Sequence, residues 1–455
     1  MNLSHKVDPY GNKNFSYEGE GILFTKDGKK HKAEFYATQL ETGESLIAFS
    51  FSNNYINFDD SSKELSIEKF LGTTKENWDI KAIAPFDAVF FNPEIPSDFF
   101  GNCDLFHSRK IEIIKTKKYT LDKYVFGITN FKFGITSNHE QKFSLEDGID
   151  VNIKKKNNYS DIIHNLKISK GINVTAEIAI ENSNDNGFDD ITKIIDDLCY
   201  LLSLARGTKI QWVYCKEINK KGDICKVKHF NHVTKPYVFL EVIDVNSTML
   251  ISEFIDKTYN NYLIRGEEFN LDKGTIDAYL DARTMHDFLE LRGLKVAIVL
   301  EMIVNSFSNN NKGIDNIISE DMYNSIAEEL KICFKNKLED LNLNSNEIQA
   351  FTGKNKLKQL NRRSFISLIK KLFKYIKLDF DYKEINLFKK SRNHLVHQGK
   401  FYSQVNFGGT PFSDPTEEYF FMINMLDKIL LKIIGYSGEY IDWSTPANPK
   451  KCYLE

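Results

Sequence analysis

The sequence lacks the short motifs that mark several large classes of enzyme. It contains no G-x-x-x-x-G-K-[ST] phosphate-binding loop, no G-x-G-x-x-G that opens a helix, no G-x-S-x-G and no H-E-x-x-H. These absences argue against an NTP-driven motor, a nicotinamide-dependent enzyme, an α/β-hydrolase and a zinc protease. The sequence therefore predicts no cofactor.

It also lacks a long apolar run and a cysteine framework. The segment VAIVLEMIV (296–304) is too short to cross a bilayer and contains Glu301. The opening residues, MNLSHKVDPYGNK, hold no apolar signal core. The cysteines are scattered along the chain, at Cys103, Cys199, Cys215, Cys225, Cys333 and Cys452. We therefore expect a cytoplasmic protein with reduced thiols and no membrane partner.

What is present is the composition of a folded protein. Of the 455 residues, 42% are hydrophobic, 27% charged and 13% aromatic, which argues against wholesale disorder. This length predicts two or three domains, because one core rarely serves so long a chain. The formal net charge of −3 gives no global sign of nucleic-acid binding, so any basic surface must be local.

The first part of the chain is rich in strand signals. The segment GILFTKDGKKHKAEFYATQ (21–39) places a Lys-Asp-Gly-Lys turn between two alternating stretches, which predicts a hairpin. The Pro-, Gly- and Asn-rich stretch FNPEIPSDFFGNCD (91–104) suggests a break between two β-rich units, 1–104 and 105–275. Within the second unit, residues 189–206 repeat apolar side chains at helical spacing and precede Gly207, so one embedded helix is predicted there.

From about residue 280 the apolar residues recur at the period of helices. Five helical stretches are predicted, over residues 285–307, 318–338, 362–377, 382–398 and 416–434. Short polar loops join them, which favours one helical bundle over 280–436 and leaves a tail over 437–455. The predicted fold class is therefore α+β multidomain, with a β-rich amino-terminal region followed by an all-α bundle.

The segment KKSRNHLVHQGKFY (389–402) carries more chemistry than a folding helix needs. Asp381 and Glu384 form a D-x-x-E capping pair, so the helix should begin at Tyr382, and Gly399 is placed to end it. Its predicted buried stripe consists of Ile385, Phe388, Leu395 and Val396. His397 then lies in the last turn. An imidazole changes protonation near neutral pH, which suits proton transfer.

The candidate catalytic residues are Arg392, Asn393 and His397. Asn393 and His397 are four residues apart and share a helix face, whereas Arg392 and His397 differ by about 140° around the axis. Two copies of the chain meeting across a symmetry axis could bring one copy's histidine to the other copy's arginine. RNA cleavage without a metal needs such groups: a base, an acid and a cation for the charged phosphorane. DNA lacks the 2′-hydroxyl and could not react in this way.

The segment RNHLVH resembles the R-x4-6-H motif of HEPN domains, and residues 285–436 look like their ApeA-like branch in bacterial antiphage defence. The resemblance implies a metal-independent ribonuclease in which Arg392 and His397 are catalytic and Asn393 supports them. It also implies a homodimer, or a higher even oligomer, that cleaves host RNA during abortive infection, with tRNA the leading substrate. A phage-derived trigger or inhibitor would then act on the amino-terminal region. Members of the family often place Gly directly after the histidine, whereas here Gln398 intervenes.

Lysines are abundant around this segment. Residues 353–377 hold nine Lys and Arg and no acid. One interpretation is the solvated face of an ordinary bundle helix, and the other is a track for RNA phosphates. The track would consist of Lys370, Lys371, Lys374, Lys377, Lys389, Lys390 and Lys400. Glu301, in an apolar helix, could orient Arg392 or simply reach the bundle surface.

Two metal sites are weak alternatives. His394 and His397 are three residues apart, but no third ligand is apparent near them, so His394 could simply be exposed. The set Cys215, Cys225, His229 and His232 lacks the close cysteine pair of a zinc site, and alternation places Cys225 and His229 on one strand face.

Other functional classes remain open. The bundle could hold RNA or a nucleotide without cutting it, or serve as a dimerising scaffold. The protein could also be a toxin silenced by a separate antitoxin.

Overall fold

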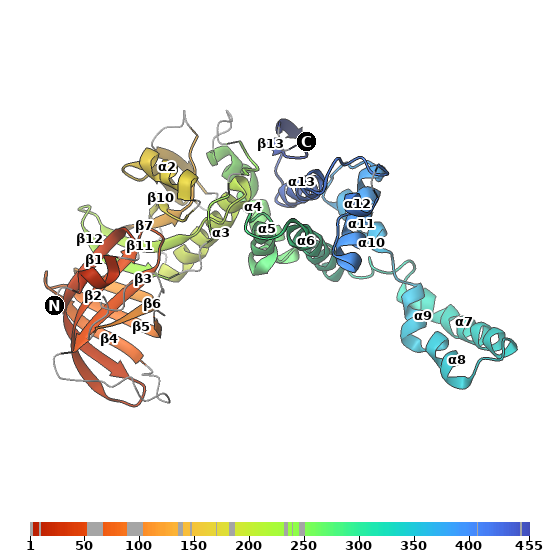
Figure 1. Ribbon diagram of the computed structural model, residues 1–455, viewed down its shortest axis with the longest axis horizontal. Coiled ribbons are helices and arrows are strands. Elements are labelled where there is room, and N and C mark those ends of the chain that lie inside the picture. Colours follow the sequence, from red (N-terminus) through yellow and green to blue (C-terminus); the bar gives the residue numbers. More distant parts are fainter. Residues whose placement is uncertain are drawn as a thin grey trace. The chain divides into compact units, whose positions relative to one another are not determined.

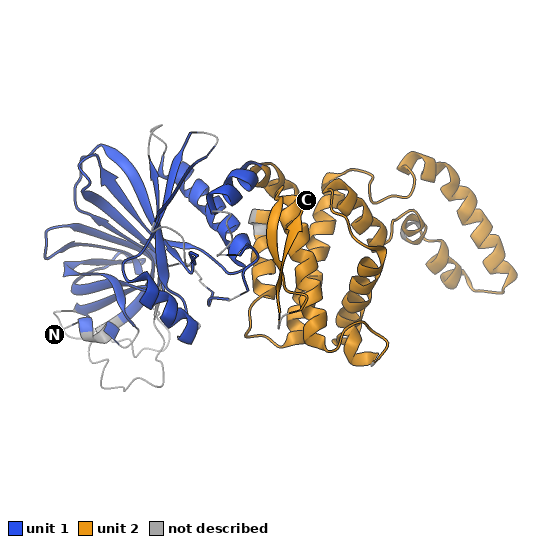
Figure 2. Ribbon diagram, turned by 90° about the horizontal axis from the view of Figure 1, so that it is seen from above, with its two compact units in different colours: residues 1–260 blue, residues 261–455 orange. Residues whose placement is uncertain are grey.

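A computed structural model describes residues 3–8, 11–51, 67–88, 103–134, 140–145, 148–169, 171–181, 187–231, 235–238, 240–244, 251–406, 408–445 and 448–455. The chain divides into two compact units, residues 1–260 and 261–455 (Figure 2). The first contains a large β-sheet and the second is mostly helical (Figure 1), which confirms the expected α+β organisation. Among the described residues, no helix has both the length and the apolar character needed to cross a bilayer.

The first unit is built on one sheet. Its strands within the described residues are β1 Lys13–Thr25, β2 Lys30–Leu40, β3 Ser45–Phe51, β4 Ile67–Thr74, β5 Asp79–Ala88, β6 Cys103–Ile114, β7 Leu121–Thr129, β8 Glu140–Ser144, β9 Asp150–Lys155, β10 Val174–Glu181, β11 Trp212–Asn219 and β12 Ile224–Phe230. The strand order is β3-β2-β1-β4-β5-β6-β12-β11-β7-β10-β9-β8. The hairpin predicted over 21–39 is confirmed, with Phe24 paired to Lys30 and Gly28 at a φ of +84° in the turn.

The sheet closes on itself over its first six strands. Strand β3 pairs with the first half of β6, where Ile47 lies opposite Phe106, so β1 to β6 form a ring. Strand β12 pairs with the second half of β6 and carries the sheet out of the ring. Residue 104, the expected unit boundary, lies in β6, and residues 91–102 of the expected break lie outside the described residues. Aliphatic and aromatic side chains fill the ring of strands, and Phe70 packs against Phe35 and Phe49.

Helices accompany the sheet. The predicted helix over 189–206 is α3, Phe188–Arg206, and Gly207 ends it with a left-handed φ of +62°. The sequence did not predict α1 (Ser4–Val7), α2 (Tyr159–Ser169) or α4 (Ile251–Glu268).

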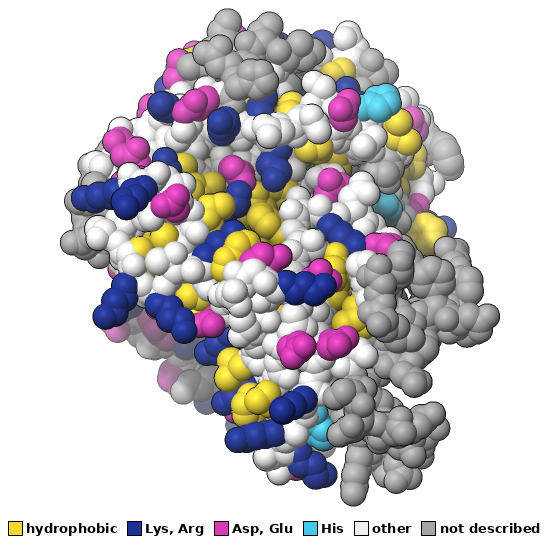
Figure 3. Space-filling model, turned by 90° about the vertical axis from the view of Figure 1, so that its left-hand side faces the viewer, with side chains coloured by type: hydrophobic (Ala, Val, Ile, Leu, Met, Phe, Trp, Pro, Cys, Tyr) yellow, Lys and Arg dark blue, Asp and Glu magenta, His cyan; other side chains and the backbone are white. Residues whose placement is uncertain are grey.

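On the face of the molecule drawn in Figure 3, hydrophobic side chains reach the surface near the middle, with Lys and Arg side chains among them.

The second unit contains the predicted helices and several shorter elements. After the end of α4 come a π-helical turn Leu271–Thr275, α5 Ile276–Ala282, α6 Leu289–Asn310, α7 Glu320–Asp340, α8 Ser345–Thr352, α9 Lys354–Leu360, α10 Phe365–Tyr375, α11 Tyr382–Gln398, α12 Tyr402–Val405, α13 Pro415–Ile433, β13 Gly438–Asp442 and β14 Lys450–Leu454. Helix α6 packs against α5, α10, α11 and α13. The expected tail over 437–455 forms a hairpin in which Tyr440 of β13 pairs with Cys452 of β14.

A buried network of three polar side chains links α5 to α13. Arg283 Nη1 donates to Asp427 Oδ1 at 2.6 Å and to the Tyr279 hydroxyl at 2.9 Å. The same hydroxyl donates to Asp427 Oδ1 at 2.6 Å. Burial raises the pKa of the Asp427 carboxyl, while the Arg283 charge opposes that rise.

Helix α7 does not join the helices around α6 in the way the sequence predicted. Helix α7 packs mainly against α8, and α8 packs against α9. Tyr323 is the one buried residue of α7. A neck closes the insertion formed by residues 318–360. There Ile317 N–H donates to Asn361 C=O at 2.7 Å, and Arg363 N–H donates to Asp315 C=O at 2.7 Å. The Asn361 side chain also bonds both backbone groups of Ile318.

Candidate active site on helix α11

Capping groups define both ends of α11. The Asp381 carboxylate accepts a hydrogen bond from the Lys383 N–H at 3.0 Å and satisfies one of the first-turn donors. Gly399 takes a left-handed φ of +65°, and its N–H bonds the Leu395 carbonyl at 3.0 Å. The predicted start and end of the helix are therefore confirmed, and His397 does lie in the last turn.

The apolar face of α11 is narrower than predicted. Ile385, Phe388 and Leu395 are buried, and Ser391 is buried with them. Val396, which the sequence placed in the buried stripe, is 41% exposed. The correction follows from geometry, because residue 396 lies about 100° around the helix from residue 395 and only one of them can face α6.

Arg392 is held by two side chains. Its Nε donates to Glu301 Oε1 at 2.7 Å, and its Nη2 donates to the same oxygen. Its Nη1 donates to Asn393 Oδ1 at 2.9 Å. The guanidinium carbon also lies 5.4 Å from the centre of the Phe365 ring of α10. Glu301 belongs to α6, so three helices fix this one arginine.

The way Arg392 is held leaves part of its donor set available. A guanidinium has five N–H donors, and the contacts with Glu301 and Asn393 engage three of them. One hydrogen on Nη1 and one on Nη2 have no partner within the described residues, and the side chain keeps 21% of its surface exposed. This outer edge has the spacing that binds two oxygens of one phosphate.

His394 and Lys390 of α11 form a second small group with Tyr402 of α12. The His394 ring lies 5.2 Å from the Tyr402 ring of α12, and Lys390 Nζ approaches the Tyr402 hydroxyl at 3.5 Å. His394 is half-buried, and its Nδ1 has no hydrogen-bond partner among the described residues. His394 is thus not the simply exposed side chain that one reading of the sequence allowed.

The His397 side chain is exposed and lies apart from the cluster around Arg392. Within the described residues no hydrogen bond or ion pair links it to another side chain, and the structure does not bring it to Arg392. Arg392, Asn393 and Glu301 are thus gathered into one cluster, whereas His397 lies one turn further along the helix. Asn393 connects the two regions, because it contacts Arg392 and shares a helix face with His397.

Most of the lysines of the expected track are exposed. These are Lys370, Lys374, Lys377, Lys389, Lys390 and Lys400, whereas Lys371 is half-buried. Lys370 Nζ lies 4.0 Å from the centre of the Tyr382 ring, which ties α10 to the start of α11. Positive charge is therefore available on both helices beside Arg392.

Sequence reasoning missed the residues that support this site. Phe365 and Tyr402 contact Arg392 and His394, and nothing in their spacing signals that role. Gly293 of α6 is also needed, because a Cβ there would lie 2.6 Å from the Phe401 ring and 3.0 Å from Leu395. An isolated glycine inside a strongly apolar helix was the available signal for such a close approach.

Neither alternative metal site is formed. No cluster of three or more His, Cys, Asp and Glu side chains in the described part of the chain is arranged to hold a metal ion. His229 is buried between the Tyr17 hydroxyl and the Gln39 amide. His232 lies outside the described residues.

The comparisons with known proteins point to the β-rich unit. Residues 116–236 match the family described as the YopA central domain, and this segment covers β7 to β12, α2 and α3. No curated protein and no solved structure matches the chain. The resemblance of residues 285–436 to HEPN domains of the ApeA-like branch is therefore wrong, because no match to such a family is found. A short R-x4-H pattern in a capped helix arises in unrelated helical proteins and does not define a family.

Proposed function

We propose that the second unit is a metal-independent endoribonuclease. In this proposal Arg392 stabilises the charged phosphorane, His397 transfers protons, and Asn393 positions the phosphate. The supporting observation is the arginine held by Glu301 and Asn393 with its outer edge accessible, on the helix that also presents an exposed imidazole. A guanidinium fixed before the substrate arrives stabilises developing charge with little reorganisation.

The chemistry follows from these groups. A neutral imidazole takes the proton of a 2′-hydroxyl while its oxygen attacks the adjacent phosphorus. A protonated imidazole gives a proton to the departing 5′-oxygen. The products are a 2′,3′-cyclic phosphate and a 5′-hydroxyl, and the two imidazoles end with their protonation states exchanged. The exposed lysines of α10 and α11 supply sequence-independent attraction for the RNA backbone.

The proposed reaction uses one imidazole as base and a second as acid, and one chain places a single histidine in the last turn of α11. Arg392 and His397 of one chain also point to different sides of the helix. We therefore propose that two copies of α11 meet in one cleft, which holds Arg392 and His397 of both copies. The proposed antiphage setting and the preference for tRNA followed only from the rejected resemblance, so they are not part of this proposal.

A cleavage assay in EDTA tests the activity. The wild type, His397→Ala and the neighbouring control Gln398→Ala are incubated with a mixed RNA pool. We expect the control to cleave like the wild type and His397→Ala to lose at least about 100-fold, the usual contribution of a proton-transferring group. RNA binding without cleavage by the wild type would instead indicate a binding module.

The shared cleft is tested with mixed dimers of the wild type and His397→Ala. If one cleft uses His397 of both copies, a mixed dimer lacks one of the two imidazoles and should be nearly as slow as the His397→Ala dimer. Isolated mixed dimers that keep about half of the wild-type activity would contradict sharing between copies.

A further inference from the structure

A second polar site lies in the first unit, on one face of the sheet. Its central groups are Lys115, Lys156 and Lys216, which we call the lysine cluster. Lys216 is on β11, Lys115 directly follows β6, and Lys156 directly follows β9. The backbone of Lys115 is fixed by a 2.8 Å bond to the Cys225 carbonyl, and that of Lys156 by a 3.0 Å bond to the Thr175 carbonyl.

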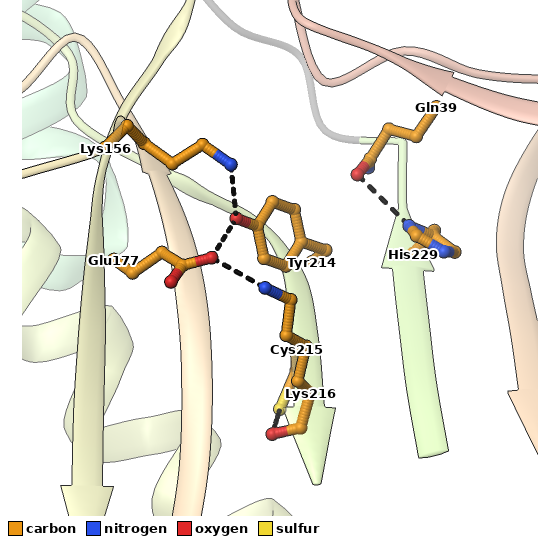
Figure 4. A network of polar contacts seen from close by, with 7 residues as sticks. All are labelled: Gln39, Lys156, Glu177, Tyr214, Cys215, Lys216 and His229. Atoms are coloured by element: carbon orange, nitrogen blue, oxygen red, sulfur yellow. Dashed lines mark hydrogen bonds and ion pairs between the residues drawn. The ribbon is translucent and has the colours of Figure 1, made fainter. Parts of the chain in front are cut away.

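Lys216 is organised by a carboxylate and a tyrosine (Figure 4). Lys216 Nζ donates to Glu177 Oε1 at 2.7 Å, and the Tyr214 hydroxyl donates to the same oxygen at 2.6 Å. Lys156 Nζ approaches the Tyr214 hydroxyl at 3.4 Å. The Tyr214 ring lies directly over Gly127, where a Cβ would come within 2.1 Å of ring carbons. Glycine at this position therefore lets the ring lie flat on the sheet and reach Glu177.

The three ammonium groups outnumber the carboxylate that touches them. Within the described residues, Glu177 is the carboxylate in direct contact with the lysine cluster, and it binds Lys216. Burial lowers the pKa of Lys156 and of Lys115, and the charge of Lys216 lowers both further. Glu177 and Glu41 oppose the shift of Lys156, and Glu76 opposes that of Lys115. Such partly desolvated cations of like charge gain from the arrival of an anion.

Aromatic side chains line the same place. Lys115 Nζ lies 3.9 Å from the centre of the Trp78 ring, and Lys216 Nζ lies 5.6 Å from that of Phe15. The side chains of Phe15 and Trp78 are only partly buried, and they pack against the hydrophobic core enclosed by strands β1 to β6. Phe15 in turn contacts Tyr214, with ring centres 4.9 Å apart. The site therefore combines cations with flat apolar surface at the edge of a packed core.

We propose that the lysine cluster binds a small phosphorylated ligand of the nucleoside phosphate class. The ammonium groups of Lys115, Lys156 and Lys216 bind the phosphate oxygens, and Phe15 and Trp78 provide apolar surface for the base. Lysine is a point-charge partner for phosphate, and a planar base gains from contact with aromatic side chains. Lys156 and Lys216 lie within residues 116–236, whereas Lys115 and the two aromatic residues lie outside that segment. The site is independent of the proposed ribonuclease chemistry.

Calorimetric titration of the full chain with ATP, ADP and adenosine tests this proposal. We expect ATP and ADP to bind and adenosine not to bind measurably. Lys156→Gln is the first variant because, among the described residues, the long contact with the Tyr214 hydroxyl is the one hydrogen bond of the Lys156 side chain. Lys115→Gln is the second variant. Each should weaken ATP binding by about tenfold or more, as expected for a charge-assisted hydrogen bond.

The matched control is Lys226→Gln. Lys226, on β12, is a partly buried lysine like those of the lysine cluster. It lies on the face of the sheet opposite to Lys216 and forms an ion pair there with Glu112. This variant should bind ATP like the wild type. Absence of ATP and ADP binding by the folded wild type would overturn the proposal, and so would unchanged ATP affinity in folded Lys156→Gln and Lys115→Gln.

Discussion

At the scale of single residues, Glu301 matters more for orientation than for stability. Its ion pair with Arg392 is partly exposed, with 34% of the Glu301 side-chain surface and 21% of that of Arg392 accessible. Pairs of this kind contribute at most about 1 kcal/mol, because water screens the charges. The contact through both Nε and Nη2 nevertheless fixes the plane of the guanidinium. We therefore treat Glu301 as a positioning residue.

Glu301→Gln separates orientation from binding. The amide retains an acceptor for Nε but loses the charge, so the guanidinium should sample more orientations. We expect kcat for RNA cleavage to fall by about tenfold or more, while KM does not rise, because positive charge facing the RNA is not reduced. Steady-state kinetics with a defined oligoribonucleotide measure both. A rise in KM with unchanged kcat would contradict this role.

His229 makes the first unit sensitive to acid. Its Nδ1 lies 3.1 Å from Gln39 Oε1, while Gln39 Nε2 donates to the Val213 carbonyl, so a neutral ring with the proton on Nδ1 satisfies the site. Nε2 then accepts from the Tyr17 hydroxyl at 3.0 Å. Burial, helped by the charge of Lys216, lowers the pKa of His229 to about 3.

Because the pKa of His229 is lowered in the folded protein, the free energy of unfolding should decrease as the pH is lowered. Below its ordinary pKa of about 6.5 the unfolded chain binds a proton at His229 that the folded chain does not. The free energy of unfolding should therefore fall by about 1.4 kcal/mol per pH unit from this residue between about pH 6 and pH 4. Urea unfolding of wild type and His229→Gln at several pH values measures the difference. Equal slopes in the two proteins would show that His229 is not the responsible group.

At the scale of helices and strands, sequence periodicity located most elements but not their neighbours. The helices over 382–398 and 416–434 match α11 and α13 closely, because each has a capping residue and apolar residues at helical spacing. Helix α4 was missed because its sequence, ISEFIDKTYNNYLIRGEE, mixes aromatic and β-branched residues with polar ones. Periodicity also could not show that α7 is covered by α8 rather than by α6, since an apolar stripe does not specify what packs on it.

The close approach of α11 to α6 depends on Gly293. Alanine there would place a methyl group 2.6 Å from the fully buried Phe401 ring, so we expect a loss of about 1–3 kcal/mol in unfolding free energy. Gly266→Ala in α4 is the matched control, because no atom lies within 4 Å of its Cβ position. That change should be neutral or stabilising, since alanine favours helix. Thermal unfolding of both variants makes the comparison, and equal destabilisation would contradict the packing argument.

At the scale of the whole molecule, the candidate residues were easier to find from the sequence than the side chains that surround them. The residues Arg392, Asn393 and His397 stand together in the sequence, so proposing them required only helix geometry. Their supports could not be inferred, because Glu301 and Phe365 meet Arg392 from other helices. The lysine cluster was not predicted either, since its members come from three separated segments that the sheet register brings to one face.

The insertion over 318–360 should be separable from the rest of the second unit. The paired backbone at Asn316 and Arg362 already brings its two ends together. Replacement of residues 319–360 by a short Gly/Ser linker should therefore leave the remaining helices folded, with a melting temperature within a few degrees of the wild type, because closing a loop at a preformed neck costs little. Circular dichroism during heating measures this. Loss of cooperative unfolding would show that the insertion is part of the core.

The most direct test of the central claim is the dependence of cleavage on a single 2′-hydroxyl. An oligoribonucleotide cut by the wild type in EDTA is compared with the same oligonucleotide carrying one 2′-deoxyribose on the 5′ side of the scissile phosphate. If Arg392 and His397 catalyse attack by the 2′-oxygen, the modified strand should resist cleavage at that site, and the unmodified strand should yield a 2′,3′-cyclic phosphate. Cleavage of the 2′-deoxy strand at the same position, or products ending in a 5′-phosphate, would contradict the account.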